Sequence, residues 1–115
     1  MTITNNYPEN LSAAERYHLT LSPAVQKMKD AQDSTISVKA WALYNDTDKD
    51  GKEQEILSIL TNDGEIYATN SRTFIDDFRK MWELFVECGE IVHNITVVSG
   101  MSKAGREFIT CVYAA

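Results

Sequence analysis

The chain has 115 residues, with 11 Lys and Arg against 17 Asp and Glu, and a formal net charge of −6. This length fits one globular domain that can bury a core without disulfides or a metal. No apolar run approaches the roughly 20 residues that cross a bilayer, and the polar N-terminus lacks a signal-peptide core, so no membrane partner is expected. The excess of acidic residues argues against binding to phosphates, which are contacted by Lys and Arg.

The first 34 residues are predicted to form a flexible tail and a short helical extension. Residues 1–10 have no hydrophobic periodicity, which indicates a mobile tail. Ser12-Ala-Ala-Glu15 is a capping-box pattern and predicts the start of a helix. Ser22-Pro23 predicts a second start, with Ser as the N-cap and Pro at the first helical position. We expect this extension to pack against a domain comprising residues 35–115.

From Thr35 onward the hydrophobic period changes to two, which indicates strands. In the first predicted strand, one face carries Ile36, Val38, Ala40, Ala42 and Tyr44, and the other carries Ser37, Lys39, Trp41 and Leu43. Asp46 to Gly51 ends this strand. Residues 54–61 are expected to form a second strand, Asn62-Asp63-Gly64 a tight turn, and residues 65–69 a third strand.

The next segment has the strongest helical pattern in the chain. Its apolar residues form one stripe: Phe74, Ile75, Phe78, Met81, Trp82, Phe85 and Val86. Thr73 with Asp76 three residues on offers a capping box, Ser71 is the rival N-cap, and Gly89 is a suitable end. Residues 91–99 and 107–113 are predicted to form the fourth and fifth strands, joined by a loop over residues 100–106.

The order of elements after residue 34 is therefore β-β-β-α-β-β, which is the order of an OB-fold. We predict a mainly β, α+β fold: a five-stranded OB-like barrel with an N-terminal helical extension. An open antiparallel sheet with one helix packed on it has the same order, so both architectures remain open.

Patterns that indicate catalysis or metal binding are missing. The chain has no GxSxG, HExxH, GxxxxGK[ST] or GxGxxG pattern, so we expect neither an enzyme nor a cofactor or metal. The segment from Asp46 to Gly51 begins like a calcium loop, but position 12 is Leu57 where Ca²⁺ requires a bidentate Glu. We interpret it as a solvated turn, with a weak cation site as the alternative. Cys88 and Cys111 are expected to be free thiols in a reducing cytoplasm.

The loop near the C-terminus has the clearest functional features. Residues 91–115 are the only region with a net positive charge, from Lys103 and Arg106 against Glu107. In an OB-fold, the loop between strands four and five flanks the ligand groove together with the loop between strands one and two. An ordinary hairpin with solubilising charges is the alternative.

Two aromatic residues extend this hypothesis to the strands. Trp41 lies on the more polar face of the first predicted strand together with Lys39, and Tyr67 lies on the third. Bases stack on exposed aromatic rings while nearby cations contact the phosphates. Alternatively, Trp41 and Tyr67 cover the end of the barrel or pack beneath the helical extension.

A family resemblance supports this hypothesis. Residues 94–111, above all Ser-Lys-Ala-Gly-Arg-Glu-Phe at 102–108, resemble the C-terminal hairpin of small phage-encoded single-stranded DNA-binding proteins, and residues 57–71 add weaker similarity. The resemblance implies an OB-fold that coats single strands during replication or recombination in a bacterial host cytoplasm, without catalysis or a metal. Many such proteins end in an acidic tail that recruits partners, whereas this sequence ends Cys-Val-Tyr-Ala-Ala.

We therefore predict a single-stranded DNA-binding protein that acts by aromatic stacking and phosphate contacts. The expected nucleic-acid-binding residues are Lys39, Trp41, Tyr67, Lys103 and Arg106, with Arg72 and Phe108 as further candidates. Expected partners are single-stranded DNA or RNA, further copies of the chain, and replication or recombination proteins. The rival hypothesis is an acidic protein-binding module that inhibits a host nucleic-acid enzyme, motivated by the acidic residues between positions 46 and 65.

Overall fold

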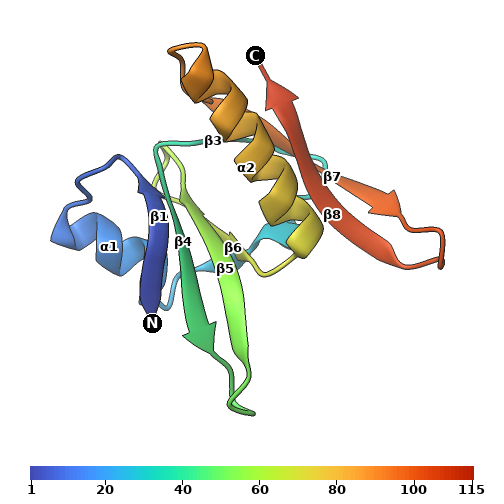
Figure 1. Cartoon of the computed structure of the whole chain (residues 1–115), viewed down its shortest axis with the longest axis horizontal. Coiled ribbons are helices and arrows are strands. Elements are labelled where there is room, and N and C mark those ends of the chain that lie inside the picture. Colours follow the sequence, from blue (N-terminus) through green and yellow to red (C-terminus); the bar gives the residue numbers. More distant parts are fainter.

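The computed structural model describes residues 1–115 as two β-sheets and a long helix that packs between them (Figure 1). The elements in chain order are β1 (Thr2–Tyr7), α1 (Ala13–Thr20), β2 (Gln26–Lys27), the 3-10 helix η1 (Met28–Ala31), β3 (Thr35–Ser37), β4 (Ala40–Thr47), β5 (Glu53–Leu60), β6 (Ile66–Thr69), α2 (Arg72–Glu87), β7 (Asn94–Met101) and β8 (Glu107–Ala114). One sheet has the order β1-β4-β5-β6-β2 and the other β3-β7-β8. The mainly β, α+β class is confirmed, but the two sheets do not close into a barrel.

The first predicted strand is in fact two strands that belong to different sheets. β3 pairs with β7, whereas β4 pairs with β5 and β1. At the break, the backbone N–H of Val38 donates to the carbonyl of His93 (2.8 Å) and that of Lys39 to the carbonyl of Leu60 (2.9 Å). The change of partner shifts the alternation of side chains by one residue, so Ile36 and Val38 share a core with Trp41 and not with Ala40.

The main core lies between the two sheets and α2. It contains 16 buried residues, and the aromatic stripe of α2 supplies its centre. Phe78 is fully buried and its ring lies 5.5 Å from Trp41 and 5.9 Å from Trp82, measured between centroids. The same cluster holds the Cys111 thiol, whose pKa burial raises to about 12, with Asp77 adding to the effect. The predicted core face of α2 is therefore confirmed except at Val86, which is 53% exposed and lies outside the core.

A smaller core lies on the other face of the five-stranded sheet, where α1 packs. Leu19 from α1 is 1% exposed and contacts a cluster of Ala and large aliphatic residues from β4, β5 and β6. The predicted capping box is confirmed, because the N–H of Glu15 donates to Ser12 Oγ (3.1 Å) and the N–H of Ser12 donates to Glu15 Oε1 (3.0 Å). These bonds to Ser12 hold the pKa of Glu15 below its usual range.

The N-terminal region differs from its prediction in two places. Residues 2–7 are not a mobile tail but form strand β1, which pairs with β4. The ring of Tyr7, the last residue of β1, packs against Trp82 with the two ring centroids 4.8 Å apart. The helix predicted at Ser22 is replaced by β2 and η1, because Met28 and Ala31 are buried in the main core. Residues 1–34 thus supply both outer strands of the larger sheet. The division of the chain at residue 35 stays a prediction.

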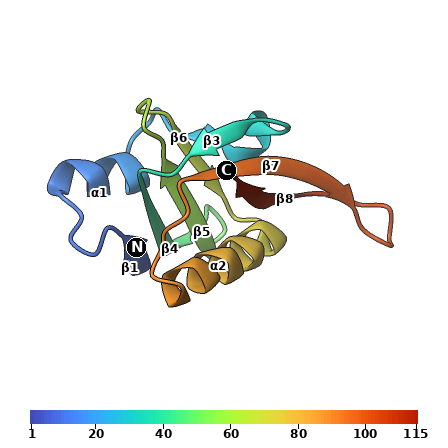
Figure 2. The same cartoon turned by 90° about the horizontal axis from the view of Figure 1, so that it is seen from above.

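The remaining boundaries lie near their predicted positions. Gly64 has a φ of 85°, as a tight turn after Asn62 requires. Ser71, not Thr73, caps α2, and Gly89 follows the helix with a φ of 75°. β7 begins three residues later and ends two residues later than predicted, and β8 is one residue longer. The distal ends of these two strands project from the body as an arm whose loop comprises residues 102–106 (Figure 2). Neither helix combines the length and the apolar character needed to cross a membrane.

Candidate nucleic-acid interface

A groove of about 530 Å³ lies where the larger sheet meets the base of the arm. Four segments that are distant in sequence line it: Lys27–Lys29, residues 54 and 56 of β5, Ala68–Ser71, and Glu107–Ile109 of β8. Its walls combine apolar carbons from Ile56, Phe108 and Ile109 with polar side chains. Among the latter, Asn70 Nδ2 donates to Gln54 Oε1 (2.9 Å).

The groove occupies the part of the sheet that α1 leaves uncovered. Ile56 and Ala68 point to the face opposite the main core, because their neighbours Leu57 and Tyr67 pack against that core. α1 covers this outer face at the other end of the sheet, over Leu60 and its neighbours. The side of the groove next to the arm is held by α2, since Ser71 Oγ donates to the Ile109 carbonyl (3.4 Å) and Thr110 Oγ1 donates to Asp77.

Lysines border the groove on the side of η1. Met28 is fully buried in the main core, and the exposed residues Lys27 and Lys29 flank it. β2 runs parallel to β6 with Lys27 paired to Ala68, which fixes the first lysine beside the groove. Lys103 and Arg106 continue the positive charge along the arm, and neither they nor Lys27 and Lys29 form an ion pair within the chain.

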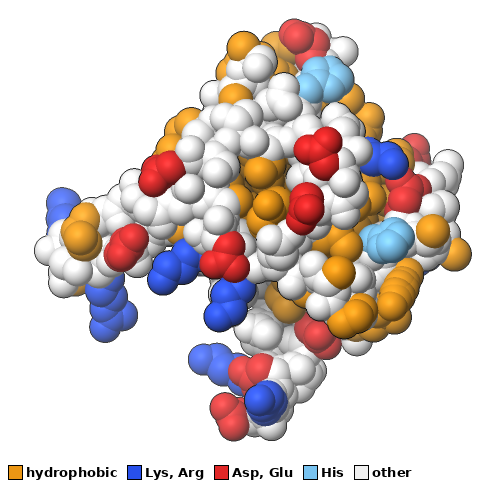
Figure 3. Space-filling model, turned by 180° about the vertical axis from the view of Figure 1, so that it is seen from behind, with side chains coloured by type: hydrophobic (Ala, Val, Ile, Leu, Met, Phe, Trp, Pro, Cys, Tyr) orange, Lys and Arg blue, Asp and Glu red, His pale blue; other side chains and the backbone are white.

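The space-filling view displays this arrangement. Lys and Arg side chains lie on the arm, on the tip of the β4–β5 hairpin, and in the recess between these two projections (Figure 3). Asp and Glu side chains are interspersed among them, so the surface has mixed charge and only a local positive character. The two hairpins that flank the groove are the two that an OB-like architecture predicts.

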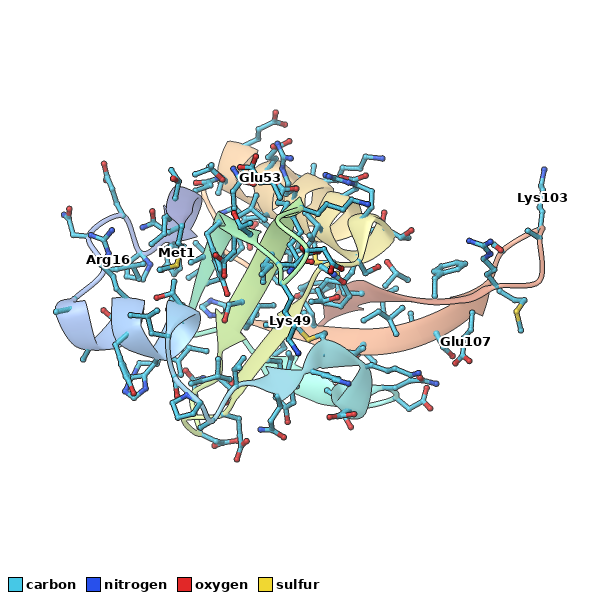
Figure 4. All side chains as sticks on the ribbon, turned by 90° about the horizontal axis from the view of Figure 1, so that it is seen from below. Met1, Arg16, Lys49, Glu53, Lys103 and Glu107 are labelled. Carbon is cyan, nitrogen blue, oxygen red and sulfur yellow. The ribbon has the colours of Figure 1, made fainter.

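The β4–β5 hairpin carries charges of both signs. One oxygen of Asp48 is used within the turn, because its Oδ1 accepts bonds from the N–H groups of Asp50 and Lys52, both at 2.9 Å. The interpretation as a turn is therefore confirmed for residues 48–51, whereas Asp46 and Thr47 still belong to β4. Lys49 projects from its tip, whereas Lys103 projects from the end of the arm (Figure 4). The acidic neighbours of Lys49 and Lys52 reduce what these lysines add to phosphate binding.

Trp41 cannot act as the predicted stacking residue. It is 2% exposed and lies edge-on against Phe78 and Trp82, because the break between β3 and β4 turns its face of the strand into the core. Tyr67 is half-buried and packs against the same core, on the face opposite the groove. The two aromatic residues pack in the core, as the alternative expected, but they pack against the cluster that α2 fills and not beneath α1, which lies on the other face of the sheet.

The other predicted binding residues fall into two groups, those away from the groove or paired within the chain and those on the arm. Lys39 is exposed but lies beside Glu15 of α1, at the end of the sheet away from the groove. Arg72 is engaged within the chain, with Nη1 2.8 Å from Glu55 Oε1 and 3.8 Å from Asp76 Oδ1. By contrast, Lys103, Arg106 and Phe108 lie on the arm, and Phe108 lines the groove.

Sequence reasoning missed Lys27 and Lys29 because it assigned their segment to a helix. The sequence carries only a weak signal, since one apolar residue, Met28, stands between Lys27 and Lys29, and the strand β2 ends at Lys27. Tyr44, the register partner of the groove residue Ile56, has a pKa raised by burial and by the nearby Asp46. It lies beneath the surface and does not reach the groove.

Comparison with known proteins identifies one family. Residues 19–113 match the family model described as phage single-stranded DNA-binding protein, of the Phi29 type. The match begins in α1 and ends in β8, so it includes all four segments that line the groove. Neither a curated protein nor a solved structure matches the chain.

Proposed function

Since this chain belongs to the Phi29 phage single-stranded DNA-binding protein family, we propose that it binds single-stranded DNA along the groove bordered by Lys27 and Lys29. The observation that carries this proposal is an open, partly apolar groove with unpaired lysines on one wall and a basic arm leading away from it. Single-strand binders combine these two elements, a cationic path for the phosphates and apolar surface for the bases.

The strand is proposed to contact Lys27 and Lys29 through its phosphates and to continue along the arm toward Lys103 and Arg106. The bases then face the groove wall, where Phe108 is the aromatic residue available for stacking. Because the protein as a whole carries a charge of −6, long-range attraction contributes little, and binding rests on these local contacts. The biological role that follows is the coating of single strands during phage replication or recombination in the host cytoplasm.

The rival hypothesis of an acidic inhibitor has less support. Two of the acidic residues that motivate it serve the fold, since Asp48 bonds to the backbone of its own turn and Glu55 pairs with Arg72. These partners reduce the phosphate-like field that the region could present to a basic enzyme.

The experiment is a titration of fluorescein-labelled oligo-dT of about 20 nucleotides, followed by anisotropy, against a duplex of equal length. The label belongs on the DNA, because Trp41 and Trp82 are 2% and 9% exposed and cannot report stacking directly. We expect tighter binding to the single strand than to the duplex, and a loss of affinity when salt is raised. Absence of binding at about 50 mM salt, or equal affinity for the duplex, would refute the proposal.

A further inference from the structure

Phe108 is an aromatic residue that the core does not use. It is half-buried, belongs to neither hydrophobic cluster, is not packed against one, and stacks on no other ring. The other large aromatic residues of the sheets and of α2 are engaged, as the pair Phe85 and Tyr113 illustrates with centroids 4.9 Å apart. An aromatic ring at the edge of a groove, without a packing role, is available to a ligand.

A glycine directly across the sheet determines where this ring lies. Gly100 of β7 is the register partner of Phe108 of β8. A Cβ at position 100 would lie 2.6 Å from Phe108 Cζ, 2.9 Å from Cε2 and 3.2 Å from Cε1. Three atoms of the ring therefore occupy the space that any other residue at position 100 would fill. The φ of Gly100 is not in the left-handed region, so its backbone conformation alone does not require a glycine.

From this contact we propose that Gly100 and Phe108 form a base-stacking platform, with Gly100 as the positioning residue and Phe108 as the residue that contacts the base. Gly100 lets the ring lie against β7, and the half-buried ring keeps surface directed to the groove. A base stacks on this surface while its flanking phosphates reach Lys27 and Lys29 on the opposite wall. The platform rests on the proposed function, since it specifies the part of the site that recognises a base and not a phosphate.

The test compares oligo-dT with an abasic oligonucleotide of the same length, which has the phosphates but no bases. Phe108→Leu keeps an apolar side chain but removes the stacking ring. Stacking on an aromatic residue is worth about 5- to 150-fold in affinity per base, so Phe108→Leu should weaken oligo-dT binding by at least about fivefold. Binding of the abasic oligonucleotide should not change.

Gly100→Ala tests the positioning role separately. The added methyl must displace the ring, so this variant should weaken oligo-dT binding by at least about twofold. In a Phe108→Leu background the same substitution should have no further effect, because leucine lacks the Cζ and Cε atoms that the methyl would meet. Thermal unfolding of each variant verifies that the chain is folded.

The outcomes separate the two proposals. If the wild-type chain binds oligo-dT with salt dependence but Phe108→Leu and Gly100→Ala bind equally well, the platform is wrong and the proposed function stands. If Phe108→Leu lowers the affinity for the abasic oligonucleotide by the same factor as the affinity for oligo-dT, the residue shapes the arm and does not stack on a base. That result also overturns the platform. If the wild-type chain binds neither oligonucleotide, the proposed function itself fails.

Discussion

Replacing Lys27 and Lys29 together by alanine should reduce the salt dependence of single-strand binding. Each phosphate that a protein contacts on a single strand contributes about 0.7 to the slope of log affinity against log salt. Contacts from Lys27, Lys29, Lys103 and Arg106 give a slope of about −2.8, so affinity should fall about 50-fold between roughly 50 and 200 mM salt. With both lysines replaced, the slope becomes about −1.4 and the same change in salt costs about sevenfold.

The assay is the anisotropy titration of labelled oligo-dT at four or more salt concentrations. The matched control replaces Arg79 and Lys80, which are exposed but do not line the groove. This control should retain the full slope, and a separate Lys39→Ala variant decides whether Lys39 belongs to the interface, as the sequence predicts. If the variant at positions 27 and 29 keeps the wild-type slope, or the control loses as much, the DNA does not follow the groove.

Three further predictions concern the fold. Phe78→Ala should lower the free energy of unfolding by about 3–5 kcal/mol in urea titrations, because this ring is fully buried between two tryptophans; a loss under about 1 kcal/mol would contradict the packing. Ser12→Ala should cost about 0.5–2 kcal/mol, and NMR should find the pKa of Glu15 raised in that variant. Because the folded pKa of Glu15 is lowered, the stabilisation from its carboxylate is present at neutral pH and lost as pH falls through that pKa. The difference in stability between the two proteins should therefore narrow in acid, while the part due to the bond from the Glu15 N–H to Ser12 Oγ remains. At pH 8 a thiol reagent should label the exposed Cys88 in the native chain and leave Cys111, whose pKa is about 12, unmodified until the chain is unfolded.

The parts of the fold that were predictable depend on local pattern. The stripe of α2, its cap and end, and the turn at Asn62-Asp63-Gly64 each lie within one short segment, and all three are present. The break between Val38 and Lys39 was not predictable in the same way. No residue there is a strong strand breaker, and the break exists because residues 35–37 pair with β7 while residues 40–47 pair with β5. Such a choice depends on distant strands, and it reverses the predicted exposure of Trp41.

The candidate site likewise contains residues that local sequence predicts and residues that only distant pairing brings together. Lys103, Arg106 and Phe108 were predicted because they lie on one hairpin, where neighbours in sequence are neighbours in space. The groove itself joins residues near positions 27, 55, 69 and 108, and no periodicity in the sequence connects segments so far apart. Lys27 and Lys29 were missed because the residues after Ser22 favour a helix, and nothing local in the sequence indicates that this segment pairs with β6.

The three earliest strands all pair with segments that are synthesised later. β1 requires β4, β2 requires β6, and β3 requires β7, which begins only at residue 94. On the ribosome, β1 can pair once residue 47 has emerged and β2 once residue 69 has emerged, whereas β3 has no sheet partner until most of the chain has been synthesised. Long-range pairing of this kind slows folding and leaves strand edges open to wrong partners. β1 is mostly polar (Thr-Ile-Thr-Asn-Asn-Tyr), so while it is still unpaired it is a poor template for aggregation.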